Sequence, residues 1–184
     1  MALLAGRVAV VTGASRGVGK GIALALADQG ATVYVTGRTV TPGSHSLPGT
    51  VGETARECDR RGGRGVAVAV DHADDAQVAA LFDQIRCDEG RLDILVNNAG
   101  GAPHVPLLKT SEAVFEQALR FNVTQAFLLS RMIAPMMVAS GKGNILNISS
   151  SLGRIVGRGF VAAKDLRAGE RGLDAQGNEV VFMA

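Results

Sequence analysis

The chain has 184 residues, 47% of them hydrophobic and 20% charged, and its formal net charge at pH 7 is +2. This size and composition fit one compact domain with its own core and exclude an intrinsically disordered chain. The small positive charge gives no support for binding to nucleic acid or to an anionic membrane surface.

The cysteines and the apolar stretches indicate the compartment. Cys58 and Cys87 stand apart, without metal-ligand spacing, which predicts free thiols in a reducing environment and no metal site. The longest apolar stretch, residues 127–139, contains Arg131 and is too short to span a membrane. Arg7 interrupts the N-terminal apolar segment too early for a signal peptide. We therefore expect a soluble, cytoplasmic protein.

Apolar runs of strand length alternate with segments of helical period, which is typical of a parallel sheet built from strand–helix–strand units. Right-handed crossovers then favour an α/β fold, a Rossmann-like doubly wound parallel sheet with strand order 3-2-1-4-5 and each strand buried on both faces. We expect strands at residues 7–11, 32–36, 65–70, 93–96 and 144–148, and helices at 18–29, 53–61, 74–88 and 112–139. Beyond residue 148 the pattern fades, and only 180–183 is expected to form a further short strand.

A glycine-rich turn, TGASRGVG over residues 12–19, follows the first strand and opens the first helix. Glycine allows a tight turn and lets a pyrophosphate approach the backbone, while the helix N-terminus offers N–H groups and the positive end of the helix dipole. The spacing alone is also compatible with a plain strand-to-helix turn. Its place between a buried strand and a helix favours a phosphate-binding site.

Four motifs, in order, are similar to those of the short-chain dehydrogenase/reductase family. They are TGASRGVGKGIA at 12–23, NNAG at 97–100, Asn122 in the long helix, and Ser149-Ser150 after the fifth strand. Together they cover about 160 of the 184 residues. The resemblance implies an oxidoreductase that transfers a hydride between a nicotinamide cofactor and a small carbonyl or alcohol substrate.

For the cofactor, the resemblance implies contacts from the glycine-rich turn, from the ends of the second and third strands and from the NNAG motif. The residues implied are Gly13, Ser15, Arg16, Gly17, Val18, Gly19, Arg38, Asp71, His72, Asn98, Ala99 and Gly100. Asp71 and His72 would border the adenine, and Asn98 would line the ribose. Apart from the resemblance, a lone histidine at a strand end, such as His72, is more often a surface residue. His45 and His104 are expected to have no role.

The residues after the second strand indicate NADP rather than NAD. An acidic residue there would accept hydrogen bonds from the adenosine ribose and favour NAD, but this chain has Gly37-Arg38. With Arg16, Arg38 offers two guanidinium groups where a 2′-phosphate would lie, and the arginine fork matches phosphate oxygens. The alternative is that Arg38 is an ordinary solvated loop arginine.

Hydride transfer to a carbonyl needs an acid for the developing alkoxide and donors that polarise the oxygen. The resemblance implies Ser150 as the donor to the substrate oxygen and Asn122 as the residue that holds a water on the proton path. A serine that caps the end of a strand is the alternative for Ser150. The family also uses a tyrosine as the acid, with a lysine four residues later that lowers the pKa of the tyrosine.

No tyrosine stands at the family position. Counting about thirteen residues from Ser150 reaches Ala163, and a shifted register pairs Phe160 with Lys164. The only tyrosine of the chain, Tyr34, is in the second strand, where we expect it to lie far from the nicotinamide. We therefore expect the motifs to define a cofactor site whose usual proton donor is missing.

The motifs also suggest a division of the chain. We expect a dinucleotide-binding domain over 1–162 and a divergent, poorly ordered tail over 163–184, with the later strands of the family missing. The fifth strand would then form an open edge, and the long helix would expose Phe127, Leu128 and Met132, which favours self-association or a homo-oligomer.

Two functions remain open on these grounds. One is an NADP-dependent oxidoreductase acting on a small carbonyl or alcohol substrate. The other is a catalytically inactive nucleotide-binding module, or a truncated remnant, that acts only through binding or dimerisation. A nucleic-acid-binding or regulatory protein is disfavoured, because the sequence has neither a basic stripe nor an aromatic platform.

Overall fold

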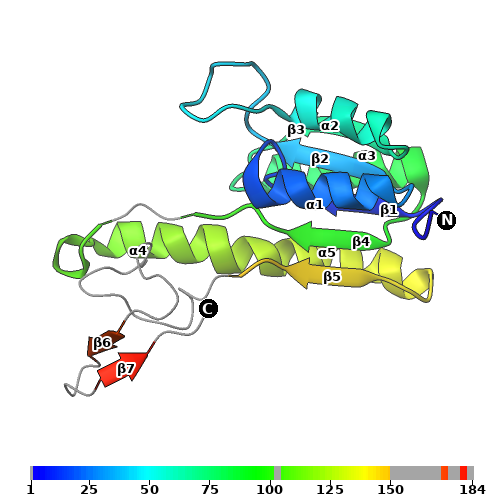
Figure 1. Cartoon of the computed structure of the whole chain (residues 1–184). Helices are drawn as coiled ribbons and strands as arrows, with labels where there is room; N and C mark the ends of the chain where they lie inside the picture. Colours follow the sequence, from blue (N-terminus) through cyan, green and yellow to red (C-terminus); the bar gives the residue numbers. More distant parts are fainter. Residues whose placement is uncertain (1, 102–104, 150–170, 174–178, 182–184) are drawn as a thin grey trace. The chain divides into compact units, whose positions relative to one another are not determined.

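The computed structural model describes residues 2–101, 105–149, 171–173 and 179–181 (Figure 1). Within them lies a five-stranded parallel sheet with the order β3-β2-β1-β4-β5, which confirms the expected topology. The strands are β1 Val8–Val11, β2 Thr32–Gly37, β3 Arg64–Ala69, β4 Ile94–Asn97 and β5 Asn144–Asn147. Ser150, Ala163 and Lys164, on which the catalytic expectations depend, lie outside the described residues.

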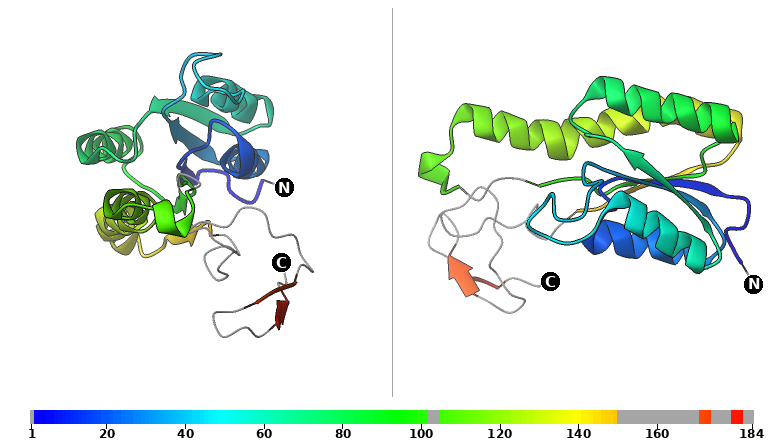
Figure 2. Two further views of the ribbon diagram at one scale, coloured as in Figure 1. Left: turned by 90° about the vertical axis from the view of Figure 1, so that its left-hand side faces the viewer. Right: turned by 90° about the horizontal axis from the view of Figure 1, so that it is seen from above.

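Helices cover both faces of this sheet (Figure 2). One face packs against α1 and α2, and the other packs against α3 and α5. Their bounds are α1 Gly17–Asp28, α2 Val51–Arg60, α3 Asp75–Glu89 and α5 Gln125–Ala139. Successive side chains of a strand point to opposite faces, so Ala9 and Val11 enter the core under α1, whereas Val8 and Val10 enter the core under α3.

Two of the helix starts follow from capping residues. Thr50 accepts a hydrogen bond from the Glu53 N–H, and the Glu53 carboxylate accepts one from the Thr50 N–H, which forms a capping box ahead of α2. Asp74 caps α3 by accepting from the N–H groups of Ala76 and Gln77. Both helices therefore begin close to the predicted positions.

The two edge strands depart from the prediction that every strand is buried on both faces. β1 and β4 are buried throughout, but no residue of β3 is fully buried, and all four residues of β5 are exposed. An edge strand has a neighbour on one side only, and β5 has none beyond β4 within the described part of the chain. Ile145 and Leu146 are consequently 39% and 45% exposed.

The long helix predicted over 112–139 is divided. Its parts are α4 Glu112–Leu119, a π-helical turn η2 Arg120–Thr124, and α5. On α5, Phe127 and Met132 are exposed as expected, whereas Leu128 is half-buried. The sequence pattern could not show the π turn, because a single extra residue per turn barely changes the apolar period.

The described residues form two compact units. The first holds residues 1–100 and 120–148, with the sheet and helices α1, α2, α3 and α5. The second holds the short 3-10 turn η1 Leu107–Lys109, helix α4, and an antiparallel pair of strands, β6 Arg171–Leu173 and β7 Glu179–Val181. The sequence predicted a strand near β7, but it did not predict β6.

No helix in the described segments is both long and apolar enough to cross a bilayer.

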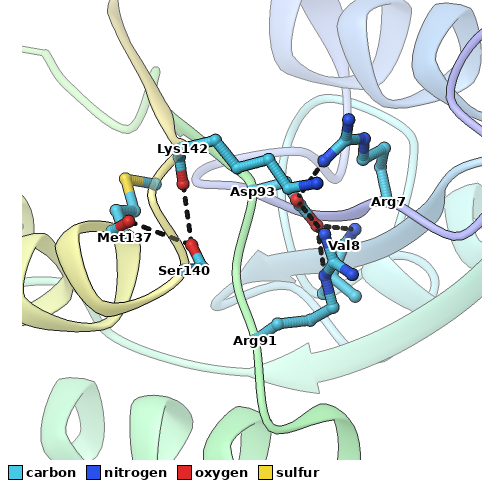
Figure 3. Close-up of polar contacts among 7 residues, drawn as sticks. All are labelled: Arg7, Val8, Arg91, Asp93, Met137, Ser140 and Lys142. Carbon is cyan, nitrogen blue, oxygen red and sulfur yellow. Dashed lines mark hydrogen bonds and ion pairs between the residues drawn. The ribbon is translucent and has the colours of Figure 1, made fainter.

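A buried carboxylate ties the sheet together at the end where the strands begin (Figure 3). The Asp93 side chain is 6% exposed and accepts hydrogen bonds from Arg7 (2.8 Å), from Arg91 and from the Val8 N–H (2.9 Å). Burial alone would raise the pKa of Asp93, but the hydrogen bonds from Arg91, Val8 and Arg7 outweigh it and lower the pKa to about 2. The carboxylate thus joins the start of β1 to the residue that precedes β4.

Replacing Asp93 by alanine should therefore destabilise the fold by about 3 kcal/mol, because it leaves two arginines and a buried N–H without their acceptor. The control is Asp83→Ala, which removes an exposed ion pair with Arg86 on α3 and should change the stability by less than about 0.5 kcal/mol. Urea denaturation followed by circular dichroism measures both. Equal stabilities of the two variants would contradict the role given to Asp93.

Candidate functional site

A pocket of about 400 Å³ opens at the carboxyl ends of the central strands, beside the start of α1. This edge of a doubly wound sheet, where crossovers leave in opposite directions from β1 and β4, is the usual ligand site of such folds. The residues that line the pocket are Gly13, Ser15, Arg16, Gly37, Arg38, Thr39, Ser44, His45, Val70, Asp71, His72, Asn98, Ala99, Gly100 and Phe121.

Most of the predicted cofactor residues meet there. Nine of the twelve line the pocket, and the other three, Gly17, Val18 and Gly19, form the first turn of α1. His45, for which the sequence predicted no role, lines the pocket, and Thr39, Ser44 and Phe121 were not singled out by the sequence. Their positions depend on the path of the loop between β2 and α2 and on the π turn, for which the sequence carried no signal.

The glycine-rich turn is held against the NNAG segment by hydrogen bonds through Thr12. Its hydroxyl oxygen accepts from the N–H groups of Asn98 (2.9 Å) and Ala99 (2.8 Å) and donates to the Val96 carbonyl. In return, the Asn98 side-chain amide donates to the carbonyls of Thr12 (2.8 Å) and Gly13 (3.2 Å). Asn98 therefore shapes the floor of the pocket, in addition to lining it.

Two glycines are required by this close approach. Gly13 has a φ of +66°, and a Cβ on it would lie 2.9 Å from the Cα of Ala99. A Cβ on Gly19 would lie 2.6 Å from the Gly13 carbonyl oxygen and would also meet the Asn98 amide. Any side chain at either position would push the turn away from the NNAG segment.

The first turn of α1 faces outward without a side-chain cap. Its N-cap residue, Arg16, forms no capping hydrogen bond, and Val18 in the first turn is 64% exposed. The first N–H groups of a helix have no intrahelical acceptor, so this end of α1 offers donors and the positive end of the helix dipole to an anion.

Arg16 joins the glycine-rich turn to the loop between β2 and α2. Its Nη2 donates to the Thr39 hydroxyl (2.6 Å) and to the Gly49 carbonyl (3.1 Å), and its Nη1 hydrogen-bonds the Nδ1 of His45. Its Nε is buried without a partner. The guanidinium is thus fixed at the pocket wall by neutral groups, and no carboxylate within the described residues neutralises it.

Arg38 is more exposed than Arg16 and is only weakly paired. Its side chain is 69% exposed, and its ion pair with Asp71 is 3.9 Å long. The two residues follow neighbouring strands, β2 and β3, at the pocket edge. An exposed and weakly paired guanidinium can turn toward a bound anion at little cost.

His72 is buried, so it is not a surface residue, although it follows the end of a strand. It is 3% exposed, and its Nε2 lies 2.7 Å from the Thr36 hydroxyl. Because that hydroxyl donates to the Val11 carbonyl, the ring proton is assigned to Nε2, and Nδ1 is buried without a partner. Burial lowers the pKa of His72 to about 4, only partly offset by the charge of Asp71, so the ring is neutral at pH 7.

Asn122 lies in the π turn, close to the NNAG segment. A Cβ on Gly100 would come within 2.7 Å of the Asn122 Oδ1. π turns widen a helix locally and occur frequently at functional sites. Arg120, the first residue of this turn, donates to Asp75 at the start of α3 (2.7 and 2.9 Å), and so does Gln125, which directly follows the turn (3.2 Å). These hydrogen bonds fix the turn relative to α3.

Asn97, the first residue of the NNAG motif, makes a network that the sequence did not predict. Its side-chain amide donates to the Asn147 Oδ1 (2.8 Å) and to the Ser130 hydroxyl (3.2 Å). The network links the ends of β4 and β5 with α5. Asn147, the last residue of β5, precedes Ser149 by two residues. It therefore positions the strand from which Ser149-Ser150 follow.

Tyr34 does not reach the pocket. It is fully buried in β2, and its hydroxyl donates to Glu89 (3.0 Å) and Asp88 (3.4 Å) at the end of α3. Burial and these acidic partners raise the pKa of Tyr34. The described residues also contain no group of three or more histidine, cysteine or acidic side chains that could hold a metal ion.

The sheet order, the glycine-rich turn and the pocket define a doubly wound α/β protein of the dinucleotide-binding class. The family model for the short chain dehydrogenase matches residues 7–164, and the chain belongs to this family. Among curated relatives, it is 39% identical to the mouse dehydrogenase/reductase SDR family member 1, over 82% of this chain and 48% of that protein. It is 42% identical to an uncharacterized oxidoreductase of Mycobacterium tuberculosis, over 85% of this chain and 57% of that protein.

Solved structures agree in fold. A metagenomic short-chain oxidoreductase in complex with NADP matches with a TM-score of 0.72 and 38% identity, over 80% of this chain and 63% of that one. A short-chain dehydrogenase/reductase from Burkholderia xenovorans matches with a TM-score of 0.73 and 32% identity, over 85% and 61% of the two chains. The chain thus spans about half the length of the curated relatives it matches.

The tight packing of the glycine-rich turn predicts that alanine has opposite effects on stability at two glycines of α1. Gly19→Ala should destabilise the fold by roughly 1–3 kcal/mol, because the new methyl group has no space. A Cβ on Gly21 would meet no atom within 4 Å, so Gly21→Ala should stabilise the helix by about 0.5–1 kcal/mol. Thermal unfolding measures both changes, and a Gly19→Ala protein as stable as Gly21→Ala would rule out the close approach.

The buried neutral His72 predicts a loss of stability in mild acid. Its pKa is about 4 in the folded chain, against an ordinary value of 6.5, so the unfolded chain binds more protons between these values, and acid favours unfolding. The free energy of unfolding should fall by about 2 kcal/mol from pH 7 to pH 5. Carboxylates whose pKa is lowered in the folded chain, such as Glu57, lose their stabilising effect mainly below their ordinary pKa of 4.5. They therefore contribute little to the change between pH 7 and pH 5.

Urea titrations at pH 7, 6 and 5 measure this loss. His72→Gln keeps a polar side chain of similar size but cannot take up the proton, so its stability should be nearly constant over the same range. A variant that loses stability in parallel with the unsubstituted chain would exclude His72 as the origin.

Proposed function

We propose that this chain is an NADP-dependent oxidoreductase of the short-chain dehydrogenase/reductase type, which transfers a hydride between NADPH and a small carbonyl or alcohol substrate. The observation that carries the cofactor preference is the pair Arg16 and Arg38 at one end of the pocket. Neither guanidinium is tightly neutralised, and no acidic residue follows β2 directly. A ribose hydroxyl would not need two cations there, whereas a 2′-phosphate would.

The remaining pocket residues fit the other parts of a dinucleotide. The uncapped start of α1 and the glycines at 13, 17 and 19 suit the pyrophosphate. Asp71 and His72 would border the adenine, and Asn98, Ala99 and Gly100 would follow the ribose on the nicotinamide side. When bound, the cofactor supplies the hydride, and the protein orients it.

For the substrate end, we assign Asn122 to a water on the proton path and Ser150 to the substrate oxygen. Support for Asn122 comes from its place in a π turn beside Gly100. Support for Ser150 comes from its place in the sequence and from the Asn97–Asn147 hydrogen bond, which fixes the strand that precedes it. A hydroxyl donor at that point would polarise a carbonyl oxygen and stabilise the developing alkoxide.

A second function, nucleotide binding without turnover, is favoured by one observation. Tyr34 is the only tyrosine of these 184 residues, and its hydroxyl is buried against Glu89. A positioned general acid contributes about 10²- to 10⁴-fold to such a reaction, and Lys164 or a water would replace it only weakly. On this alternative, the chain acts by holding the cofactor or by pairing with another copy.

The partners we propose are a small-molecule substrate and, through the exposed face of α5 and β5, a second copy of the chain, with no nucleic acid and no membrane. Cys58 and Cys87 are both free thiols, and burial raises the pKa of the Cys58 thiol to about 11, which keeps it unreactive. A reducing compartment such as the cytoplasm suits both cysteines.

The cofactor proposal is tested by fluorescence titration of the purified chain with NADPH and, separately, with NADH. NADPH should bind more tightly, and Arg38→Ala should weaken NADPH binding by about tenfold while leaving NADH binding unchanged. The matched control is Arg56→Ala, an arginine on α2 that does not line the pocket. Equal affinities for the two cofactors would contradict the NADP preference.

A carbonyl panel with the tighter cofactor then separates the two functions. NADPH oxidation that depends on an added carbonyl would support the oxidoreductase. Tight binding without oxidation would support the nucleotide-binding module.

A further inference from the structure

His45 belongs to a loop that contributes to the pocket without any sequence signal for it. The loop runs from β2 to α2, and its residues Thr39, Ser44 and His45 line the pocket beside Arg16 and Arg38. His45 is exposed, and the hydrogen bonds of its ring are both made through Nδ1. This combination of an exposed imidazole and two guanidinium groups at one pocket wall is characteristic of an anion site.

The hydrogen bonds of the ring determine where its proton lies. The Nδ1 of His45 is hydrogen-bonded to the guanidinium of Arg16 and accepts from the Leu47 N–H at 3.0 Å. Arginine can only donate, so Nδ1 carries the lone pair and the ring proton is assigned to Nε2. That N–H has no hydrogen-bond partner within the described part of the chain, so it remains available as a donor.

A bound phosphate would also accept a third donor at this wall. Arg16 and Arg38 bring two positive charges, and Asp71, 3.9 Å from Arg38, offsets one of them. A phosphate monoester offers three strong acceptor oxygens. The neutral ring of His45 adds no charge, but its Nε2–H adds a hydrogen-bond donor for one of these oxygens. Ser44 adds no donor, because its hydroxyl already donates to the Thr41 carbonyl at 2.7 Å.

We propose that His45 is a specificity residue that donates a hydrogen bond to the 2′-phosphate of NADP, together with Arg16 and Arg38. The inference rests on the proposed NADP preference and adds the loop between β2 and α2 to it. By bonding Arg16 from the same ring, His45 also holds the loop against the glycine-rich turn, so that the donors converge on one point. Binding of the adenosine 5′-phosphate end needs none of these contacts.

The test uses two fragments that differ only in the 2′-phosphate, adenosine 2′,5′-bisphosphate and adenosine 5′-monophosphate. Isothermal titration of the full chain should show tighter binding of the bisphosphate. His45→Ala should reduce this preference by about tenfold, through the bisphosphate alone. His45→Gln, whose amide can accept from Arg16 and donate to phosphate, should restore most of it. Ser46→Ala, in the same exposed loop but outside the pocket lining, is the control and should behave as the unsubstituted chain.

The outcomes separate this inference from the cofactor proposal. If the unsubstituted chain prefers the bisphosphate and His45→Ala keeps that preference, His45 has no part in the phosphate site. If His45→Ala weakens both fragments equally, the residue supports the loop only, and the inference is again wrong. If the unsubstituted chain binds both fragments equally, there is no 2′-phosphate site, and the NADP preference fails together with the role of His45.

Discussion

The contact between the glycine-rich turn and the NNAG segment is the constraint on which the site depends. Four hydrogen bonds cross it, and each involves Thr12 or Asn98. The two segments lie so close that there is no space for a side chain at Gly13 or Gly19. One of these bonds reaches the neighbouring Ala99 N–H, and one reaches the Gly13 carbonyl. This contact brings the carboxyl ends of β1 and β4 together, turns the start of α1 toward solvent, and so creates the floor of the pocket. The remaining pocket residues are arranged around that floor.

The charged side chains at the two ends of the sheet differ in how completely they are neutralised. Where the strands begin, Asp93 is buried and saturated by Arg7, Arg91 and the Val8 N–H, so that its charge is fully paired. Where they end, Arg16 is bound by neutral acceptors and Arg38 by one long ion pair. Paired charges stabilise the fold, whereas unneutralised charges at a pocket wall are available to a ligand. The first end is structural, and the second has the character of a binding site.

The family membership and the residue chemistry address different parts of the function. The family model covers residues 7–164, and the relatives are oxidoreductases by name, which supports the reaction class. The catalytic step in this family depends on a tyrosine, and the hydroxyl of Tyr34 is held by Glu89 at the end of α3, outside the pocket lining. Cofactor binding therefore has support from both sequence and geometry, and turnover has support from the family alone.

The sequence by itself determined the strand order and most helix boundaries to within a few residues, and its resemblance to the family gave most of the residues around the pocket. It could do so because the apolar periods and the glycine-rich turn are local features of the chain. It could not determine the burial of His72, the π turn at Asn122 or the approach of His45 to Arg16. These depend on which distant segments meet, and an exposed loop carries no periodic pattern that predicts its path. The burial of a strand is likewise a property of its neighbours, so β5 has the sequence of an inner strand and the exposure of an edge.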